Sequence, residues 1–170
     1  MPVPALELPG VQFTPLATSY LPVRHLGSII GFVSFIAVLA VPLILRWTDV
    51  WPDFPAWLAW GLPGVGVVWM LIQQIIIPRQ VRAMGYAERE DDLLWRSGIL
   101  FRSVQAVPYG RLQYVDVEDG PVMRRFGLQS VSLKTASGSA DVTIPGVTRQ
   151  EADRLREVLM ARGQARLAGL

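Results

Sequence analysis

The sequence contains no cysteine and only one histidine, His25, in 170 residues. The first absence excludes disulfides, thiolate metal sites and cysteine nucleophiles, and a single histidine excludes a zinc site built from several histidines of one chain. A Walker-type phosphate loop, the G-x-S-x-G motif of hydrolases and the H-E-x-x-H motif of zinc proteases are also missing. We therefore predict a protein that is not an enzyme, has no catalytic residues and holds no metal or cofactor.

An acidic run over residues 88–92 is the one stretch that suggests chemistry, because four of its five side chains are carboxylates. Carboxylates that lie close together could bind a cation or act as a general acid. Their spacing is not that of a calcium-binding loop, however, and polar residues that join two strands explain the run better. We predict a surface turn here, with an active site as the alternative.

Charged residues are missing from two long stretches of the chain. Leu26–Leu45 and Ala56–Ile77 contain no charged side chain. A bilayer core about 30 Å thick needs roughly 20 helical residues, so each run is long enough to span it. The alternative, two buried helices of a soluble protein, would leave too little polar surface to cover them. We predict transmembrane helices over residues 26–45 and 56–78, joined by an extracytoplasmic loop over residues 46–55.

The ends of these helices carry an uneven distribution of charge. Arg24 precedes the first helix and Arg79 follows the second, whereas the loop has one arginine against two aspartates. Because basic residues favour the cytoplasmic side, we predict a multi-pass protein of the cell membrane with both termini in the cytoplasm. Five prolines in residues 1–25 predict a flexible N-terminal tail. Four tryptophans are placed as an aromatic belt at the outer interface would be: Trp47, Trp51, Trp57 and Trp60.

Small and polar residues in the apolar runs indicate how the two helices pack. Gly27 and Gly31 form a G-x-x-x-G motif, and several glycines thin the second helix where it could approach the first. We predict packing within one helical hairpin, with a dimer interface as the alternative. His25, Gln73 and Gln74 lie near the inner ends of the helices, where we expect solvation at the level of the lipid headgroups.

Short alternating segments replace the apolar runs after residue 78. Val131, Leu133 and Thr135 alternate with polar neighbours, a pattern typical of a half-buried strand. Glycine and proline breaks separate such segments, so we expect a meander of short antiparallel strands. The predicted strands are residues 83–88, 92–97, 101–107, 113–118, 129–135 and 140–144.

A helix is predicted directly after the last strand. Thr148 and Glu151 form a capping box, and Gly163 is a suitable end for the helix. The stripe of apolar residues between them is narrow, so this helix closes an open barrel rather than lying on the membrane surface. That stripe consists of Ala152, Leu155, Val158 and Leu159.

Four motifs follow one another in the soluble part of the chain. They are Pro108-x-x-Arg111-x-Gln113-x-Val115, Pro121-x-x-Arg124-x-Phe126-Gly127-Leu128, Leu133-x-Thr135-Ala136 and Ile144-Pro145-Gly146. Behind a two-helix hairpin, this series resembles the YdbS-like bacterial PH domain family. The resemblance implies an α+β membrane protein with a transmembrane hairpin, then a small PH-like antiparallel β-barrel or sandwich over residues 83–163. A C-terminal helix caps that domain, and residues 164–170 form a tail.

The resemblance also implies a membrane-anchored, non-enzymatic module that accompanies a larger membrane protein with repeated domains of the same kind. We therefore expect an interaction or scaffold module that binds a protein partner at the cytoplasmic face, besides contacting the lipid bilayer. Residues 79–170 carry 14 basic and 11 acidic side chains, and the difference of +3 is too small to indicate nucleic-acid binding. The alternative is recognition of anionic lipid headgroups, since guanidinium groups pair well with phosphate. The candidate residues are Arg102, Arg111, Arg124, Arg125 and Lys134.

Overall fold

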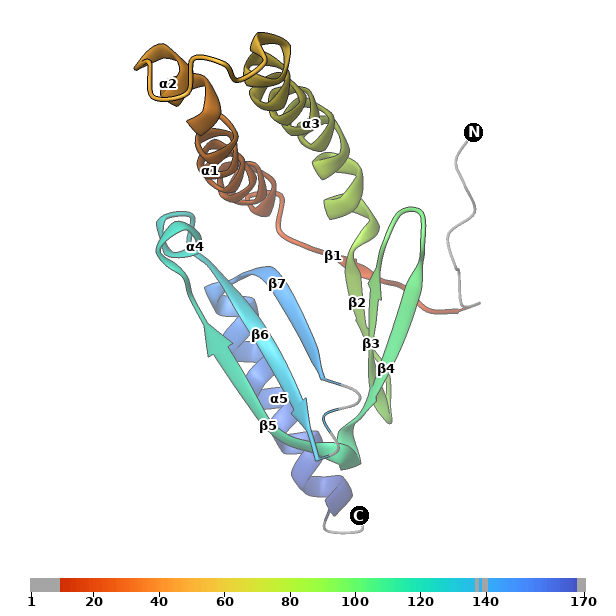
Figure 1. The fold of residues 1–170 in the computed structure, drawn as a ribbon. Helices are drawn as coiled ribbons and strands as arrows, with labels where there is room; N and C mark the ends of the chain where they lie inside the picture. Colours follow the sequence, from red (N-terminus) through yellow and green to blue (C-terminus); the bar gives the residue numbers. More distant parts are fainter. Residues whose placement is uncertain (1–9, 137, 139–140, 168–170) are drawn as a thin grey trace. The chain divides into compact units, whose positions relative to one another are not determined.

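The structure is a computed structural model that describes residues 10–136, 138 and 141–167. The chain divides into two compact units. One unit comprises residues 22–78 and contains the apolar helices. The other combines residues up to Leu21 with residues 79 onward, and it contains two antiparallel sheets and the C-terminal helix (Figure 1). These elements confirm the predicted α+β fold class.

The helical unit contains three helices: α1 (Tyr20–Leu39), α2 (Val41–Trp47) and α3 (Ala56–Ala83). α1 and α3 are long and apolar enough to cross a membrane. Only 6% and 11% of their most apolar stretches are buried within the protein, so neither is the core helix of a soluble fold. The predicted belt tryptophans are exposed, from 54% for Trp51 to 85% for Trp47.

The helix boundaries differ from the predicted ones at the prolines. α1 begins six residues early, at Tyr20, because Pro22 falls in its first turn, where a missing N–H is tolerated. A break at Ala40 separates α1 from α2, and Pro42 in the first turn of α2 explains it. α3 continues past the predicted end at Pro78 to Ala83, with Pro63 and Pro78 inside the helix.

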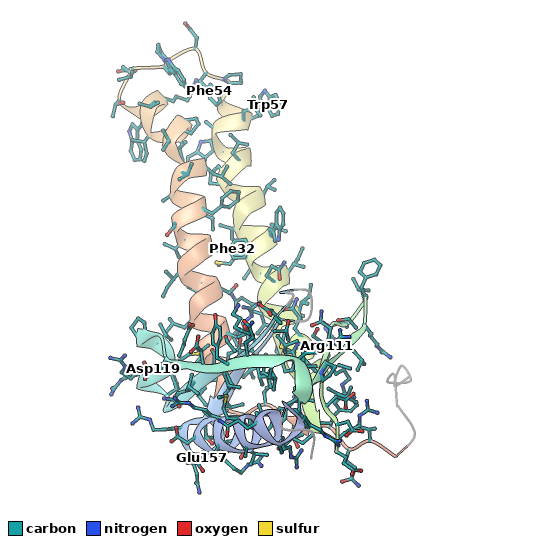
Figure 2. The ribbon with its side chains drawn as sticks, turned by 90° about the horizontal axis from the view of Figure 1, so that it is seen from below. Phe32, Phe54, Trp57, Arg111, Asp119 and Glu157 are labelled. Atoms are coloured by element: carbon teal, nitrogen blue, oxygen red, sulfur yellow. The ribbon has the colours of Figure 1, made fainter. Side chains whose placement is uncertain are left out.

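The predicted glycine packing is only partly correct. A Cβ atom added at Gly66 would lie 3.1 Å from side-chain atoms of both Ile36 and Leu39, so this glycine permits close approach of α3 to α1. Nearby, the rings of Phe32 and Trp69 are 6.5 Å apart between centroids (Phe32 is labelled in Figure 2). The other four glycines of the two spans meet nothing within 4 Å: Gly27, Gly31, Gly61 and Gly64.

The polar residues of the helices are paired rather than simply solvated, which corrects the prediction for two of them. Nδ1 of His25 lies 2.5 Å from Oε1 of Gln74. The amide of Gln74 also donates to Oγ of Ser28, at 3.3 Å. Gln74 thus joins α1 to α3 through two side-chain hydrogen bonds, which is how polar groups in a membrane-spanning pair avoid an unsatisfied donor.

In the part of the chain that the structure describes, seven strands form two antiparallel sheets. Sheet A has the order β1-β2-β3-β4, and sheet B has the order β5-β6-β7. The strands are β1 (Thr14–Pro15), β2 (Gly85–Glu88), β3 (Asp92–Ser97), β4 (Ser103–Pro108), β5 (Leu112–Glu118), β6 (Leu128–Thr135) and β7 (Val142–Thr148). The six strands expected from alternation are all present. Their ends shift by a few residues, and β7 runs through Pro145-Gly146, where the prediction ended it. The predicted start of that strand, Ala140, lies outside the described residues.

The predicted N-terminal tail is wrong from Thr14 onward. Thr14 and Pro15 form an edge strand on β2, in register with Tyr86 and Gly85. Beyond them, Leu16 and Tyr20 are buried, and the amide of Ala17 donates to the carbonyl of Gly146 at 3.1 Å. The first nine residues lie outside the described part of the chain. Residues 14–20 are therefore a part of the β domain that the predicted boundaries, 83–163, leave out.

The C-terminal helix α5 (Arg149–Leu167) follows β7 directly and lies against sheet B (Figure 1). The capping box is confirmed at its first bond, since the amide of Glu151 donates to Oγ1 of Thr148 at 3.3 Å. Ala152, Leu155 and Leu159 are fully buried, as the apolar stripe predicted.

Gly163 does not end α5, and the prediction that it would is wrong. The helix runs four residues further, to Leu167. A Cβ at Gly163 would lie 3.4 Å from the carbonyl oxygen of Tyr109, in the 3-10 turn η1 (Tyr109–Arg111). Gly163 therefore lets the helix pack closely on that turn, so its role is to permit a close contact rather than to end the helix. The predicted tail at residues 164–170 is helical as far as Leu167.

Candidate interaction surface

The β domain has two ends, which the strand register defines. At the first, which we call the entry end, Gly85 follows α3 after a single residue and pairs with Arg96. The β3–β4 hairpin turn lies just beyond, because Ser97 pairs with Ser103. Leu128 pairs with Thr148 at the same end of sheet B, and the short helix α4 (Pro121–Arg125) precedes it. The bond from Ala17 to Gly146 ties the two sheets together there.

The opposite end, called the far end, contains the β2–β3 turn, η1 and the last residues of β6. Tyr109 is fully buried there, and its hydroxyl donates to the carbonyl of Arg89 at 3.1 Å. Arg162 of α5 donates to the same carbonyl at 2.8 Å and to the Tyr109 hydroxyl at 3.0 Å. Burial raises the pKa of Tyr109, and the hydrogen bond from Arg162 opposes that rise. This end is closed by hydrogen bonds from the helix.

The five predicted cationic residues do not gather at one site. Arg102 lies in the β3–β4 turn, and Arg124 and Arg125 lie in α4, all at the entry end. Arg111 and Lys134 lie at the far end, where the carbonyl of Arg111 accepts from the amide of Ala136 at 3.3 Å. Figure 2 shows the separation along β5, with Arg111 labelled at one end and Asp119 at the other.

Arg124 and Lys134 are each paired with a carboxylate. Arg124 donates to Asp119 through two nitrogens, at 2.7 and 3.3 Å, and Arg149 lies 3.8 Å from the same carboxylate. The hydrogen bond from Arg124 lowers the pKa of Asp119. At the far end, Nζ of Lys134 lies 3.2 Å from Asp141. These pairs leave less free positive charge than the sequence suggested.

The acidic run is also occupied. Glu88 pairs with Arg154, Asp91 with Arg166, and Asp92 with Arg89 at 2.5 Å. No group of three or more metal-binding side chains is positioned to hold an ion in the described ranges of the chain. The surface turn predicted at residues 88–92 is present, and two of its carboxylates, Glu88 and Asp91, join it to α5.

One of these pairs belongs to a larger network that fixes α5 to β2. The Tyr86 hydroxyl donates to Glu151 at 2.6 Å, and Arg154 donates to both oxygens of Glu151 at 2.6 and 2.9 Å. Hydrogen bonding from Arg154 lowers the pKa of Glu151. Burial, and then the bond to Glu151, raise the pKa of Tyr86. The network is structural, since each member is held by another protein group.

β4 lies at one edge of sheet A, and the two-residue strand β1 lies at the other. Among the strands that the structure describes, β4 pairs with β3 alone. Its six residues, Ser-Val-Gln-Ala-Val-Pro, include no charge, and Gln105 and Ala106 are exposed. One edge of sheet B is β5, which carries Asp116 and Glu118. Charged residues protect an edge against a further strand, so β4 is the less protected of the two.

The tip of the β3–β4 hairpin exposes two large apolar side chains. Leu100 and Phe101 are each 91% exposed, more than any other large hydrophobic residue that the structure describes. The prediction placed Phe101 inside a strand, whereas β4 begins only at Ser103. Sequence reasoning missed this site because an alternating pattern does not show where a hairpin leaves its partner strands. The run Ile-Leu-Phe directly after Ser97-Gly98 was the signal that could have found it.

The helical unit has a groove of its own, with a volume of about 380 Å³. Phe35, Leu39, Leu62 and Trp69 contribute to its lining, which is almost wholly apolar. A groove of this kind between two membrane helices suits lipid hydrocarbon chains, and it offers no polar group for chemistry.

The chain is similar to a known protein family and to a curated protein of that kind. The family described as Bacterial PH domain matches residues 11–163. The chain is 31% identical over 130 residues to the UPF0699 transmembrane protein YdbS of Bacillus subtilis strain 168. That similarity covers 76% of this chain and 78% of the Bacillus protein. No solved structure matches.

Proposed function

This chain belongs to the bacterial PH domain family, and from that premise we propose that it is a membrane-anchored docking module that binds a protein partner along β4. The family is the one that the motif series predicted, so that prediction is confirmed. The protein is thus a transmembrane protein that contains a bacterial PH domain. The partner we propose is another membrane protein, for example a larger one with repeated PH-like domains. It contributes an extended segment that pairs with β4 as an added strand.

The open edge of β4 is the observation that carries this proposal. An exposed edge presents a row of unpaired N–H and C=O groups, and an extended peptide can pair with them as it would with a neighbouring strand. The first five residues of β4 carry no charge and each has a backbone N–H group, which the sixth, Pro108, lacks. Gln105 and Ala106 give such a peptide side-chain contacts on both faces of the sheet.

Charge supports a cytoplasmic location for the β domain. Arg79 and Arg82 close the last turns of α3, on the side of the bilayer from which the domain emerges. The loop at the other side has Arg46 against Asp49 and Asp53, and Arg46 is engaged with the carbonyls of Pro52 and Phe54. Positive residues favour the cytoplasmic side, so we propose that both termini are cytoplasmic and that the loop is outside.

A non-enzymatic role agrees with how the titratable groups are used. The acidic run is engaged in ion pairs with arginines, and the Tyr86–Glu151–Arg154 network holds α5 to β2. Headgroup recognition by Arg102, Arg111, Arg124, Arg125 and Lys134 acting together is less well supported. The five residues lie at two opposite ends of the domain, and two of them are paired with aspartates.

The proposal is tested by placing charge on the edge. We expect the double variant Gln105→Lys with Ala106→Lys to retain at least tenfold less partner than the wild-type protein, because two lysines on an edge strand oppose addition of another strand. The full-length protein and the variant would be purified in mild detergent from the native host, and the retained membrane protein would be quantified by mass spectrometry.

The matched control is Gln113→Lys with Tyr114→Lys, two adjacent exposed positions on the edge strand of the other sheet. This control should retain the partner at the wild-type level. If both double variants retain the same amount of partner, β4 is not the docking edge. Absence of any stoichiometric protein from the wild-type sample would remove the docking function itself.

A further inference from the structure

We propose that the β3–β4 hairpin tip inserts into the lipid headgroup region of the membrane that the helices span, with Leu100 and Phe101 as the inserted side chains. This contact is separate from the docking of a partner along β4. It would give the domain a second attachment to the bilayer, in addition to its covalent connection through α3.

The exposure of the two side chains is built into the turn. Gly98 has φ of +95°, and a Cβ atom there would lie 1.9 Å from the carbonyl oxygen of Phe101. Only glycine fits this tight turn. The hydroxyls of Ser97 and Ser103 lie 3.2 Å apart across its base. Leu100 and Phe101 are therefore held outward by a defined turn, where water contact with both side chains is unfavourable.

Chain connectivity places the tip at the end of sheet A that is joined to α3. α3 ends at Ala83 and β2 begins at Gly85, so a single residue joins the membrane helix to the sheet. β2 runs away from that junction and β3 returns toward it, as the pairing of Gly85 with Arg96 requires. The tip follows one residue later, at Ser97. It thus lies at the end of sheet A that the membrane helix enters.

The charge around the tip complements a bilayer surface. No acidic residue occurs between Leu93 and Val115, whereas Arg96 and Arg102 flank the apolar pair. The guanidinium of Arg96 lies 4.5 Å from the centroid of the Phe13 ring, which holds it at the entry end. Apolar side chains next to arginines are typical of segments that lie in the interface of an anionic membrane. A bilayer fits this combination better than the surface of another protein.

The natural absence of cysteine makes the test direct. A single cysteine at Leu100 (Leu100→Cys) would carry an environment-sensitive fluorophore in the full-length protein. The protein would be reconstituted alone into vesicles of phosphatidylcholine and phosphatidylglycerol, with a nitroxide-labelled lipid as quencher. The control is Ala136→Cys, an exposed position at the far end. We expect quenching at position 100 to exceed quenching at position 136 several-fold.

A second variant removes the effect of the label itself. With the fluorophore at Ser103→Cys, the substitutions Leu100→Ser and Phe101→Ser should abolish the quenching without changing the thermal unfolding temperature, because both side chains are exposed. Equal quenching at positions 100 and 136 would overturn the proposal, as would unchanged quenching in the serine variant. Because no partner is present in these vesicles, either result is independent of docking along β4.

Discussion

Replacing Gly146 with alanine is expected to lower the free energy of unfolding of the β domain by about 3 kcal/mol, whereas the same change at Gly127 should cost about 1 kcal/mol. Both glycines have a left-handed backbone, with φ of +67° and +65°. They differ in their surroundings. A Cβ at Gly127 meets nothing within 4 Å, but one at Gly146 would lie 2.2 to 2.6 Å from atoms of Tyr20.

The additional cost at Gly146 therefore measures how tightly the N-terminal segment is held. The alanine methyl group would displace the Tyr20 ring and strain the bond from Ala17 to the Gly146 carbonyl. Thermal unfolding of the full-length protein in micelles gives the stability of the three proteins. Digestion with a nonspecific protease reports whether residues 10–19 become accessible.

Two results would contradict this interpretation. Equal destabilisation by both alanine variants would mean that the Tyr20 ring does not pack closely against Gly146. Additive costs of Gly146→Ala and Tyr20→Ala in the double variant would also contradict it, because removing the Tyr20 ring should make most of the extra cost of Gly146→Ala disappear.

The substitution Leu155→Ala should destabilise the domain by about 3 kcal/mol, which is typical for truncation of a fully buried leucine. The side chain lies in the apolar stripe of α5, the face that packs on sheet B. The same substitution at Leu100 should leave stability unchanged, because that side chain is 91% exposed. Chemical or thermal unfolding of the two variants in the same detergent makes the comparison.

The two leucine variants also test whether the hairpin tip and α5 belong to the core of the domain. A Leu100→Ala variant that unfolds as readily as Leu155→Ala would show that the hairpin tip belongs to the core of the domain and is not an exposed turn. A Leu155→Ala variant with wild-type stability would show that α5 is not needed to close the barrel.

The regular elements of this fold could be predicted because periodicity is a local property of the sequence. Two uncharged runs gave the membrane helices, and alternation at Val131, Leu133 and Thr135 gave β6. The capping box at Thr148 located the start of α5 to the residue. In each case the side chains within one element carry the information.

Features that depend on distant partners could not be predicted in this way. Thr14 and Pro15 carry no strand pattern, and they form β1 only because β2, some seventy positions later, presents an edge. Gly163 has the form of a helix end, yet the close approach of Tyr109 explains it. Residues in sequence order give no indication of which remote backbone will lie against them.

The candidate site shows the same limit. Arginines could be selected by residue type, but their separation into two ends follows from strand register. The pairing of Arg124 with Asp119 follows from the turn that leads into α4. The open edge of β4 is a consequence of pairing order, which the residues of β4 do not contain. The tip at Leu100 depends on where two strands stop pairing, which shifts by a residue or two with tertiary context.

The most direct test of partner docking along β4 is photocrosslinking in the native host. A photoreactive amino acid would be introduced at Gln105 or Ala106, and separately at Gln113 or Tyr114 of β5, in the full-length protein. Docking along β4 predicts one discrete protein adduct from β4 and none from β5, with the adduct lost when the neighbouring β4 residue is replaced by lysine. Adducts from β5 alone, or only lipid adducts from β4, would contradict it.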